Sequence, residues 1–205
     1  MYIEQLRSGI PYFTFRILSL HKKAMTDVFF EELSSELHKG VHKKGHPFRY
    51  LTMATVGDSN IARLRTVVLR QVGEDLKLSI YTDGRTKKME HIHQNDRVSL
   101  LVYHPKKLLQ LKIEGRAVVV TDKERLQKYW SGVQPSSRKD YITKNIPGST
   151  IDNPDHVAYL EDENFFTIID IVPEKIEYLK LKRPNHLRVL FTRKKEDWEG
   201  SFLVP

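Results

Sequence analysis

Apolar residues alternate with polar ones, or run almost without interruption, in short segments between residues 48 and 193. Segments of this kind that are bounded by Gly, Asn and Asp are typical of β-strands. We expect a bulge or sharp bend at Gly115, inside the longest segment. The expected strands are residues 48–56 and 61–70, which form a hairpin, then 76–82, 98–104, 108–121, 165–172, 175–181 and 187–193.

Three other segments carry helical signals. Apolar residues recur at helical spacing in residues 25–45, where Thr26 or Asp27 is the expected cap and two glycines are expected to end the helix. A short helix is expected over residues 87–95, and another begins at the capping residue Asp122. Residues 131–162 are rich in Ser, Pro, Asn and Gly, so we expect either a functional loop or a partly helical segment.

Many strands with few helices predict a mainly β protein, an antiparallel barrel or sandwich rather than a parallel α/β sheet. Neither a GxGxxG fingerprint nor a GxxxxGK[ST] loop is present, so dinucleotide-binding α/β folds and P-loop enzymes are not supported. We expect residues 1–25 to be an N-terminal arm and residues 26–205 to be a single domain. Met25 is a second plausible start of the chain.

Composition narrows the class of protein. The share of hydrophobic residues is 40% and that of charged residues is 29%, as in ordinary globular proteins. With no cysteine, the chain has no disulfides, thiolate nucleophiles or cysteine-based zinc sites. No apolar run reaches the roughly 20 residues that cross a bilayer. At the N-terminus, the charged residues Glu4, Arg7 and Arg16 interrupt the apolar positions, so the uninterrupted apolar core of a secretory signal is missing. We therefore expect a cytoplasmic protein that is not in a membrane.

The net charge of +8 has three interpretations, namely a basic solvated surface, an anionic ligand such as a phosphate ester, or nucleic acid. Arg85, Lys87 and Lys88 crowd one turn, and a second group of basic residues lies in 182–195. Small clusters at loops fit a phosphate pocket better than the long stripe that a nucleic acid requires.

The strand RLRTVVLR carries arginines at both ends of an apolar stretch. Alternation places Arg63, Arg65, Val67 and Leu69 on one face and residues 64, 66, 68 and 70 on the other. Taken alone, such arginines usually reach solvent at the strand ends. The alternative is that the strand faces a flat ligand.

The segment TDGRTKK places hydroxyl and ammonium groups where a helix begins. Thr82, Thr86, Lys87 and Lys88 would surround the free N–H groups of the helix N-terminus, which suits a phosphate dianion. A basic turn alone is usually just solvated, but combined with the preceding strand it indicates a phosphate site.

In order and spacing, these segments and those after them resemble the pyridoxamine 5'-phosphate oxidase family of FMN-binding split barrels. The matching elements are Arg65-Thr66-Val67-Val68-Leu69-Arg70, Tyr81-Thr82, Thr86-Lys87-Lys88, Asn95-Asp96-Arg97-Val98-Ser99-Leu100-Leu101, Gln110 to Gly115 and Tyr129-Trp130. The resemblance covers residues 48–142 well and the last 40 or so weakly.

The resemblance implies a six-stranded antiparallel split barrel with flanking helices, which forms a homodimer and binds FMN between its subunits. The phosphate would be held by Arg65, Thr86, Lys87 and Lys88, and Gln110 of the other subunit would bind the pyrimidine edge of the ring. The remaining cofactor-binding residues that it implies are Thr66, Val67, Val68, Leu69, Arg70, Tyr81, Thr82 and Arg188.

The substrate site departs from the family pattern. The resemblance maps substrate contacts onto Arg70, Tyr129, Ser137 and His186. Two arginines of the family pattern are missing, however. Val133 stands in the place of the one between Tyr129 and Ser137, and Pro184 stands in the place of the other. Each lost arginine removes about 1.5–3 kcal/mol of charged hydrogen bonding. Arg138 or Lys139 lies near enough in sequence to compensate.

The leading hypothesis is therefore an FMN-dependent oxidoreductase whose small-molecule substrate differs from pyridoxamine phosphate; no catalytic residue is assigned. The alternatives are an FMN carrier without turnover and a basic nucleic-acid-binding barrel, and a nucleic-acid partner is not expected. No metal site is expected, because His91 and His93 would face different sides of their helix.

Overall fold

The computed structural model describes the backbone of residues 12–195 and 197–205, and side chains from residue 25 onward except 59 and 196. Its strands are β1 (Tyr50–Val56), β2 (Ala62–Val72), β3 (Leu78–Asp83), β4 (Arg97–His104), β5 (Leu109–Val119), β6 (Phe166–Lys180), β7 (Leu187–Lys194) and β8 (Asp197–Leu203). Its helices are α1 (Tyr12–His42), α2 (Lys87–Gln94), α3 (Lys123–Ser131) and α4 (Pro135–Arg138), with 3-10 turns at Pro47–Arg49, Asp58–Asn60, Lys139–Tyr141 and Pro154–His156.

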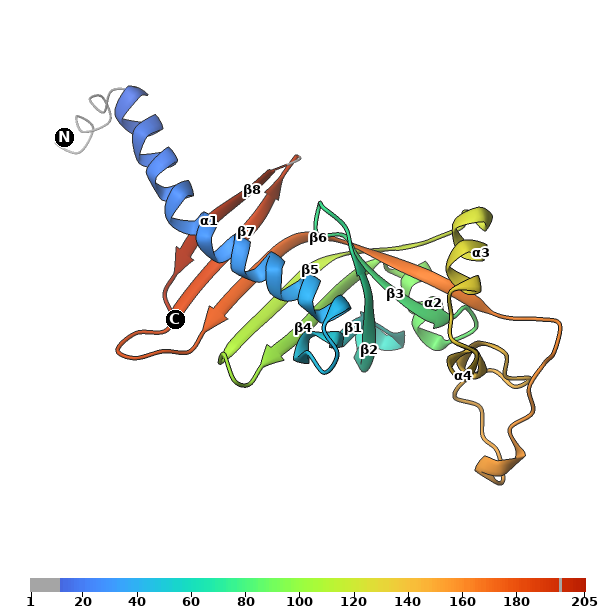
Figure 1. The fold of residues 1–205 in the computed structure, drawn as a ribbon. Coiled ribbons are helices and arrows are strands. Elements are labelled where there is room, and N and C mark those ends of the chain that lie inside the picture. The colour runs from blue at the N-terminus through green and yellow to red at the C-terminus, as the bar shows by residue number, and fades with distance from the viewer. Residues whose placement is uncertain (1–11, 196) are drawn as a thin grey trace.

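The strands form one antiparallel sheet in the order β3-β2-β1-β4-β5-β6-β7-β8 (Figure 1). An additional pairing of β3 with β6 closes β1 to β6 into a barrel, and β7 and β8 continue beyond it. The predicted mainly β, six-stranded antiparallel barrel with flanking helices is confirmed. The predicted hairpin is also confirmed, since β1 and β2 pair from Tyr50–Val68 to Val56–Ala62.

The two strands expected at 165–172 and 175–181 are one continuous strand, β6, so that prediction was wrong. Pro173, which lacks a backbone N–H, lies between the two expected strands. The structure places it at a register shift opposite Gly115, where Glu174 is the extra residue. A Cβ on Gly115 would collide with the Val172 carbonyl oxygen, so the bend expected at this glycine is present and requires it. Strand β8 was not predicted from the sequence.

Helix α1 spans Tyr12–His42 in the described residues, so Met25 lies inside it rather than at its start, and the helix continues through Gly40. Residues 12–39 contain neither Pro nor Gly, so nothing in the sequence interrupts the helix there. Thr26, expected to be a cap, is buried inside the helix against Gly200 of β8, where a larger residue would collide with it. The expected boundary at residue 25 thus falls inside one helix, and residues 1–11 of the expected arm lie outside the described residues.

The described part of α1 covers the sheet extension through aromatic contacts (Figure 1). The Phe29 ring lies 5.6 Å from that of Tyr178 in β6, and the Phe30 ring lies 5.3 Å from that of Phe191 in β7. Phe30 also contacts Trp198 of β8 at 5.8 Å. Aromatic pairs at these separations stabilise the packing beyond the area they bury.

The remaining helices follow the sequence closely. Helix α2 occupies the expected segment, and the Asp122 carboxylate caps α3 by accepting hydrogen bonds from two backbone N–H groups. Residues 131–162 are partly helical, as one of the two expectations had it. No helix in the described ranges has the length and apolarity that a membrane crossing requires.

A buried carboxylate joins α1 to the end of the barrel. Glu36 is 1% exposed and accepts hydrogen bonds from Lys39 at 2.7 Å, from Lys107 at 2.9 Å and from His46 Nε2 at 3.2 Å. The two lysines outweigh the opposing effect of burial and lower the pKa of Glu36 to about 2. Folding therefore favours the charged carboxylate.

We expect Glu36→Gln to lower the free energy of unfolding by about 3 kcal/mol near neutral pH, because a neutral amide loses the charge-assisted hydrogen bonds that the buried carboxylate accepts from Lys39 and Lys107. Chemical denaturation measures this loss. The exposed pair of Glu114 with Lys112 supplies a matched control, and Glu114→Gln should cost under about 1 kcal/mol.

The pH dependence has a defined sign. A carboxylate whose pKa is lowered by folding contributes stability above its unfolded pKa and loses it as pH falls toward the folded value, here about 2. The difference in the free energy of unfolding between wild type and Glu36→Gln should therefore narrow below about pH 4.5. A difference that does not change with pH would contradict a lowered pKa of Glu36.

Candidate functional site

A lysine and two threonines converge at the turn between β3 and α2. Lys88 Nζ donates hydrogen bonds to Thr82 Oγ1 at 2.8 Å and to Thr86 Oγ1 at 3.0 Å. Thr86 precedes the helix, and its hydroxyl donates to the Asp83 carbonyl oxygen at 2.9 Å rather than capping the helix. All three belong to one short segment, so the sequence could predict that they meet.

Arg65 brings a second cation from the neighbouring strand. Its Nη1 donates to Thr55 Oγ1 at 2.8 Å and to the Met53 carbonyl oxygen at 3.3 Å. Burial, and then repulsion by Arg65, lower the pKa of Lys88 to about 8. Burial also lowers the pKa of Arg65. We call Arg65, Thr82, Thr86 and Lys88 the cationic cradle.

Among the described residues, no carboxylate forms a salt bridge with the cradle. Asp83 is bound instead by Arg85, with Arg85 Nη2 2.7 Å from Asp83 Oδ2. Neither Arg65 nor Lys88 forms a salt bridge anywhere in the described part of the chain. Helix α2 starts at Lys87 and adds the partial positive charge of its N-terminus. Two cations and two hydroxyls in this setting suit a dianion such as a phosphate monoester.

Two polar residues that were not predicted to belong to the site, Thr55 and His91, hold Arg65 in place. Thr55 Oγ1 lies 2.8 Å from Arg65 and 3.0 Å from Nδ1 of the buried His91, so it connects the arginine to α2. Thr55 alternates in phase with the apolar residues Leu51 and Met53, and this polar position on the inward face was the available signal.

The expected alternation in β2 is confirmed. Val67 and Leu69 are buried in the barrel, whereas Leu64 on the other face is 68% exposed, and Thr66 is exposed as well. The side chain of Lys87, also expected to bind phosphate, is exposed and makes no hydrogen bond or salt bridge with the described residues, so its expected role stays a prediction.

Tyr81, Tyr129, Trp130, Tyr141 and Phe166 pack together under α3, and we call them the aromatic cluster. Arg70 lies beside this cluster rather than in the cradle. Its guanidinium carbon is 5.5 Å from the centre of the Tyr81 ring, and its buried Nε has no hydrogen-bond partner. Tyr129 lies 6.1 Å from Tyr81 on the same side. Arg70 and Tyr129 therefore both lie beside the Tyr81 ring, and their expected substrate role stays a prediction.

Gln110 and Arg188 form a separate group. Both pair with Leu179, so the three side chains share one face of the sheet. This is the outward face, because the neighbours of Gln110 on either side, Leu109 and Leu111, are fully buried. Arg188 makes a salt bridge with Glu177 at 3.0 Å. Neither Gln110 nor Arg188 contacts the inward-facing cradle in the described chain.

The other two expected substrate residues are dispersed. Ser137 is half-buried in α4, and His186 lies in the exposed connection between β6 and β7, where its Nδ1 accepts a hydrogen bond from the Lys182 N–H. One chain therefore does not gather the full set of expected substrate residues.

Glu36, His46 and His104 lie close enough to suggest a metal site, but their hydrogen bonds indicate otherwise. Each histidine accepts a backbone N–H at Nδ1, from Phe48 at 3.2 Å and from Lys107 at 3.3 Å. A neutral imidazole bonded in this way carries its proton on Nε2, which in both cases faces Glu36. The carboxylate therefore meets N–H donors, and neither Nε2 offers a lone pair.

Comparison with known proteins agrees with this geometry. Residues 28–121 match the family model described as "Pyridoxamine 5'-phosphate oxidase, FMN-binding domain". A pyridoxine/pyridoxamine 5'-phosphate oxidase of Haemophilus influenzae is 23% identical over 94% of this chain and 96% of its own length. That of Leptospira biflexa is 25% identical over 76% of this chain and 78% of its own length.

Solved structures share the fold. A pyridoxamine 5'-phosphate oxidase-related, FMN-binding protein of Nostoc punctiforme has a TM-score of 0.71 at 22% identity, covering 85% of this chain and 96% of its own. PhzG of Burkholderia lata, in complex with tetrahydrophenazine-1-carboxylic acid, has a TM-score of 0.70 at 17% identity, covering 90% and 93%. At these identities the likeness concerns the fold alone.

Proposed function

Since the chain is a pyridoxamine 5'-phosphate oxidase-like split-barrel protein, we propose that it binds FMN and serves as an FMN-dependent oxidoreductase for a small molecule. The supporting observation is the cationic cradle, in which two half-buried cations without a carboxylate partner face two hydroxyl groups. FMN adds the dianion that this charge distribution lacks.

In this proposal the cradle holds the phosphate, and the backbone and side chains of Thr66 to Arg70 in β2, with Tyr81 and Thr82, line the ribityl chain and the ring. Bound FMN supplies two-electron transfer chemistry. The protein orients the ring, and Gln110 of a second subunit offers hydrogen bonds at the pyrimidine edge, where negative charge develops on reduction.

We expect the purified protein to take up FMN and show a flavin spectrum, with riboflavin bound far more weakly because it lacks the phosphate. Arg65→Ala and Lys88→Ala should each weaken FMN binding roughly tenfold to a hundredfold, the value of a charge-assisted hydrogen bond. Lys44→Ala, at an exposed lysine outside the predicted phosphate-binding segment, is the matched control and should change affinity little. Fluorescence titration measures all four proteins, and equal affinities for FMN and riboflavin would refute the assignment.

The charge of Lys88 also predicts a pH dependence. The pKa of Lys88 is about 8 in the free protein, and a bound dianion raises it. Above pH 8, binding must therefore take up a proton, and affinity should fall by up to about tenfold per pH unit. Lys88→Arg keeps the charge at every accessible pH and should remove this dependence.

Turnover is tested by bleaching of the flavin absorbance on addition of NAD(P)H or an amine. A protein that binds FMN tightly but is bleached by no such donor would instead be a flavin carrier.

The two faces that hold the expected flavin contacts favour a homodimer. Arg65 points inward and Gln110 outward, so within one chain they lie on opposite sides of the barrel wall. The outward face also exposes large apolar residues, with Tyr50 58% and Tyr103 43% exposed. We propose that a second copy covers this face and completes the site.

Light scattering should give twice the 24.1 kDa of one chain. Tyr103→Glu places a charge in the proposed interface, so it should dissociate the dimer and weaken FMN binding although the cradle is unchanged. Val204, which is 88% exposed at the C-terminus, supplies the control Val204→Glu. A monomeric wild type that binds FMN fully would overturn this part of the proposal.

The proposed substrate differs from pyridoxamine phosphate because Val133 stands where the family pattern has an arginine. Val133 packs on the aromatic cluster with Tyr129 and Trp130. Arg138 does not replace the missing charge directly, since its Nε donates to the Val133 carbonyl oxygen at 3.2 Å and its guanidinium lies over the Trp130 ring. The wall formed here is apolar and aromatic, and it favours a substrate without a phosphate at this position.

Val133→Arg should therefore increase affinity for pyridoxamine phosphate about tenfold or more and leave FMN affinity nearly unchanged. Difference spectra of the FMN-loaded protein measure both. Val133→Leu is the control and should give no gain; a gain equal to that of the arginine variant would show that charge is not what the site lacks.

A further inference from the structure

Arg85 lies inside the predicted phosphate-binding segment but faces away from the cradle. Its Nε and Nη2 bind both carboxylate oxygens of Asp83, at 3.1 and 2.7 Å. The same Nη2 donates to the Thr143 carbonyl oxygen at 2.8 Å, and Nη1 donates to that of Lys144 at 3.4 Å. The guanidinium carbon lies 3.3 Å from the centre of the Phe165 ring. One side chain thus contacts the β3–α2 turn and two segments far away in the sequence.

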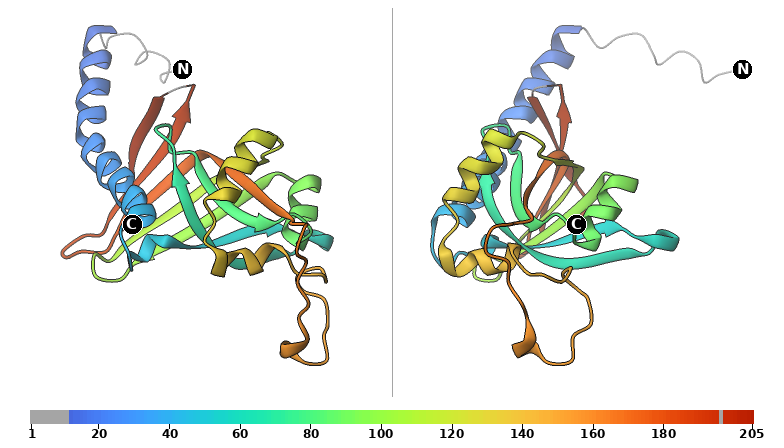
Figure 2. Two further views of the ribbon diagram at one scale, coloured as in Figure 1. Left: turned by 45° about the vertical axis from the view of Figure 1, so that its right-hand side comes forward. Right: turned by 90° about the vertical axis from the view of Figure 1, so that its right-hand side faces the viewer.

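Those two segments are the start and the end of one long loop, residues 142–165. Figure 2 shows this loop extending away from the barrel between α4 and β6. Its base is closed by backbone hydrogen bonds of 2.8 Å from Lys144 to Ala158 and from Leu160 to Ile142. Arg85 is therefore the side chain that fixes the base of the loop to the body of the protein.

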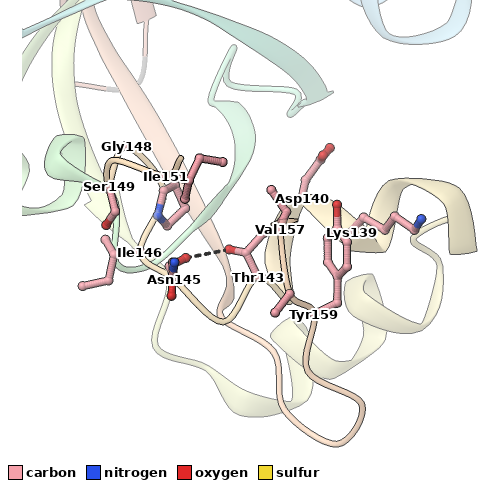
Figure 3. A pocket seen from close by; sticks show the side chains of 12 residues that line it. Lys139, Asp140, Thr143, Asn145, Ile146, Gly148, Ser149, Ile151, Val157 and Tyr159 are labelled. Atoms are coloured by element: carbon pink, nitrogen blue, oxygen red, sulfur yellow. Dashed lines mark hydrogen bonds between the residues drawn. The ribbon is translucent and has the colours of Figure 1, made fainter. Parts of the chain in front are cut away.

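The loop has the composition of a contact surface. It forms most of a cavity of about 410 Å³, whose lining residues include the apolar Ile146, Ile151 and Val157 and the ring of Tyr159 (Figure 3). Ile146 is 52% exposed and Tyr159 is 44% exposed. The orientation of the loop consequently decides where this apolar surface is presented.

Asp83 connects the loop base to the cradle. Its carboxylate is held by Arg85, while its backbone carbonyl oxygen accepts hydrogen bonds from the hydroxyls of Thr86 at 2.9 Å and Thr82 at 3.3 Å. Both hydroxyls belong to the cradle. A phosphate that accepts these hydroxyl hydrogens competes directly with the Asp83 carbonyl for them.

We propose that Arg85 is a positioning residue that couples occupancy of the cationic cradle to the placement of the 142–165 loop. The inference rests on the proposed FMN binding. A phosphate in the cradle redirects the Thr82 and Thr86 hydroxyls, the Asp83 turn adjusts, and Arg85 transmits the adjustment to Thr143 and Phe165. The cofactor thereby orders the loop and fixes the position of its apolar surface.

Amide hydrogen exchange of residues 142–160, measured by mass spectrometry with and without saturating FMN, tests the coupling. In the wild type FMN should slow exchange in this loop about tenfold, the value of one charge-assisted hydrogen bond. In Arg85→Ala the loop should exchange at the same rate with and without FMN. Arg97→Ala removes an arginine from an exposed pair with Glu174 and should behave like the wild type.

A purely structural role predicts a different pattern. Arg85→Ala would then speed exchange equally in both states, and the ratio between them would stay that of the wild type. Such an unchanged ratio overturns the inference, as does a wild-type loop that ignores bound FMN. Should Arg85→Ala not fold, Arg85→Lys carries the test, because a single ammonium cannot bridge Asp83 and Thr143 together and should lose most of the FMN effect.

FMN binding is followed by fluorescence in the same samples, which separates the two claims. Bound FMN with an uncoupled loop refutes the coupling alone. Failure of FMN to bind at all refutes the proposed function, and the coupling falls with it.

Discussion

The change of partner along β6 is the constraint on which the rest of the structure depends. Residues Phe166–Ile171 of this strand pair with β3 and close the barrel, whereas Lys175–Lys180 pair with β7 and begin the extension. The register shift between the two halves occurs where Gly115 lets the Val172 carbonyl approach. Closure aligns Asp83 with Phe166, so it sets the cradle turn and the end of the long loop side by side. The extension supplies the surface that α1 covers.

The cradle illustrates how a binding site departs from the rules that stabilise the rest of the chain. Other buried charges in the described residues have partners, as Asp170 has Arg125 at 2.6 Å and Glu36 has two lysines. Arg65 and Lys88 instead share a half-buried site with no carboxylate between them, and the repulsion contributes to the lowered pKa of Lys88. Such an arrangement costs stability in the free protein, and a dianionic ligand removes that cost on binding. The same physics makes the phosphate, rather than the flavin ring, the part of the cofactor on which affinity should depend most.

The residues expected to bind the cofactor and those expected to bind the substrate are separated in space, and they also differ in how well they agree with the family pattern. The cradle lies at the inward face of β2 beside α2, and the aromatic cluster with Arg70 and Tyr129 lies under α3. Gln110 and Arg188 occupy a third surface on the outward face of β5 and β7. Under the proposed function, variation at Val133 would therefore alter the substrate without disturbing the phosphate site, and the third surface would reach the flavin only from a neighbouring subunit.

The sequence by itself determined the features whose signals lie within one element or one turn. The alternation in β2, the Asp122 cap and the meeting of Thr82, Thr86 and Lys88 needed only local spacing, and each agrees with the structure. Only the tertiary structure decided which strand pairs with which half of β6, that residues 197–203 form a strand beside β7, and that Arg85 turns from the cradle to the loop. These outcomes depend on contacts between segments tens of residues apart. A proline or an arginine has the same local propensity whether or not such a partner is present, so no local pattern could have revealed them.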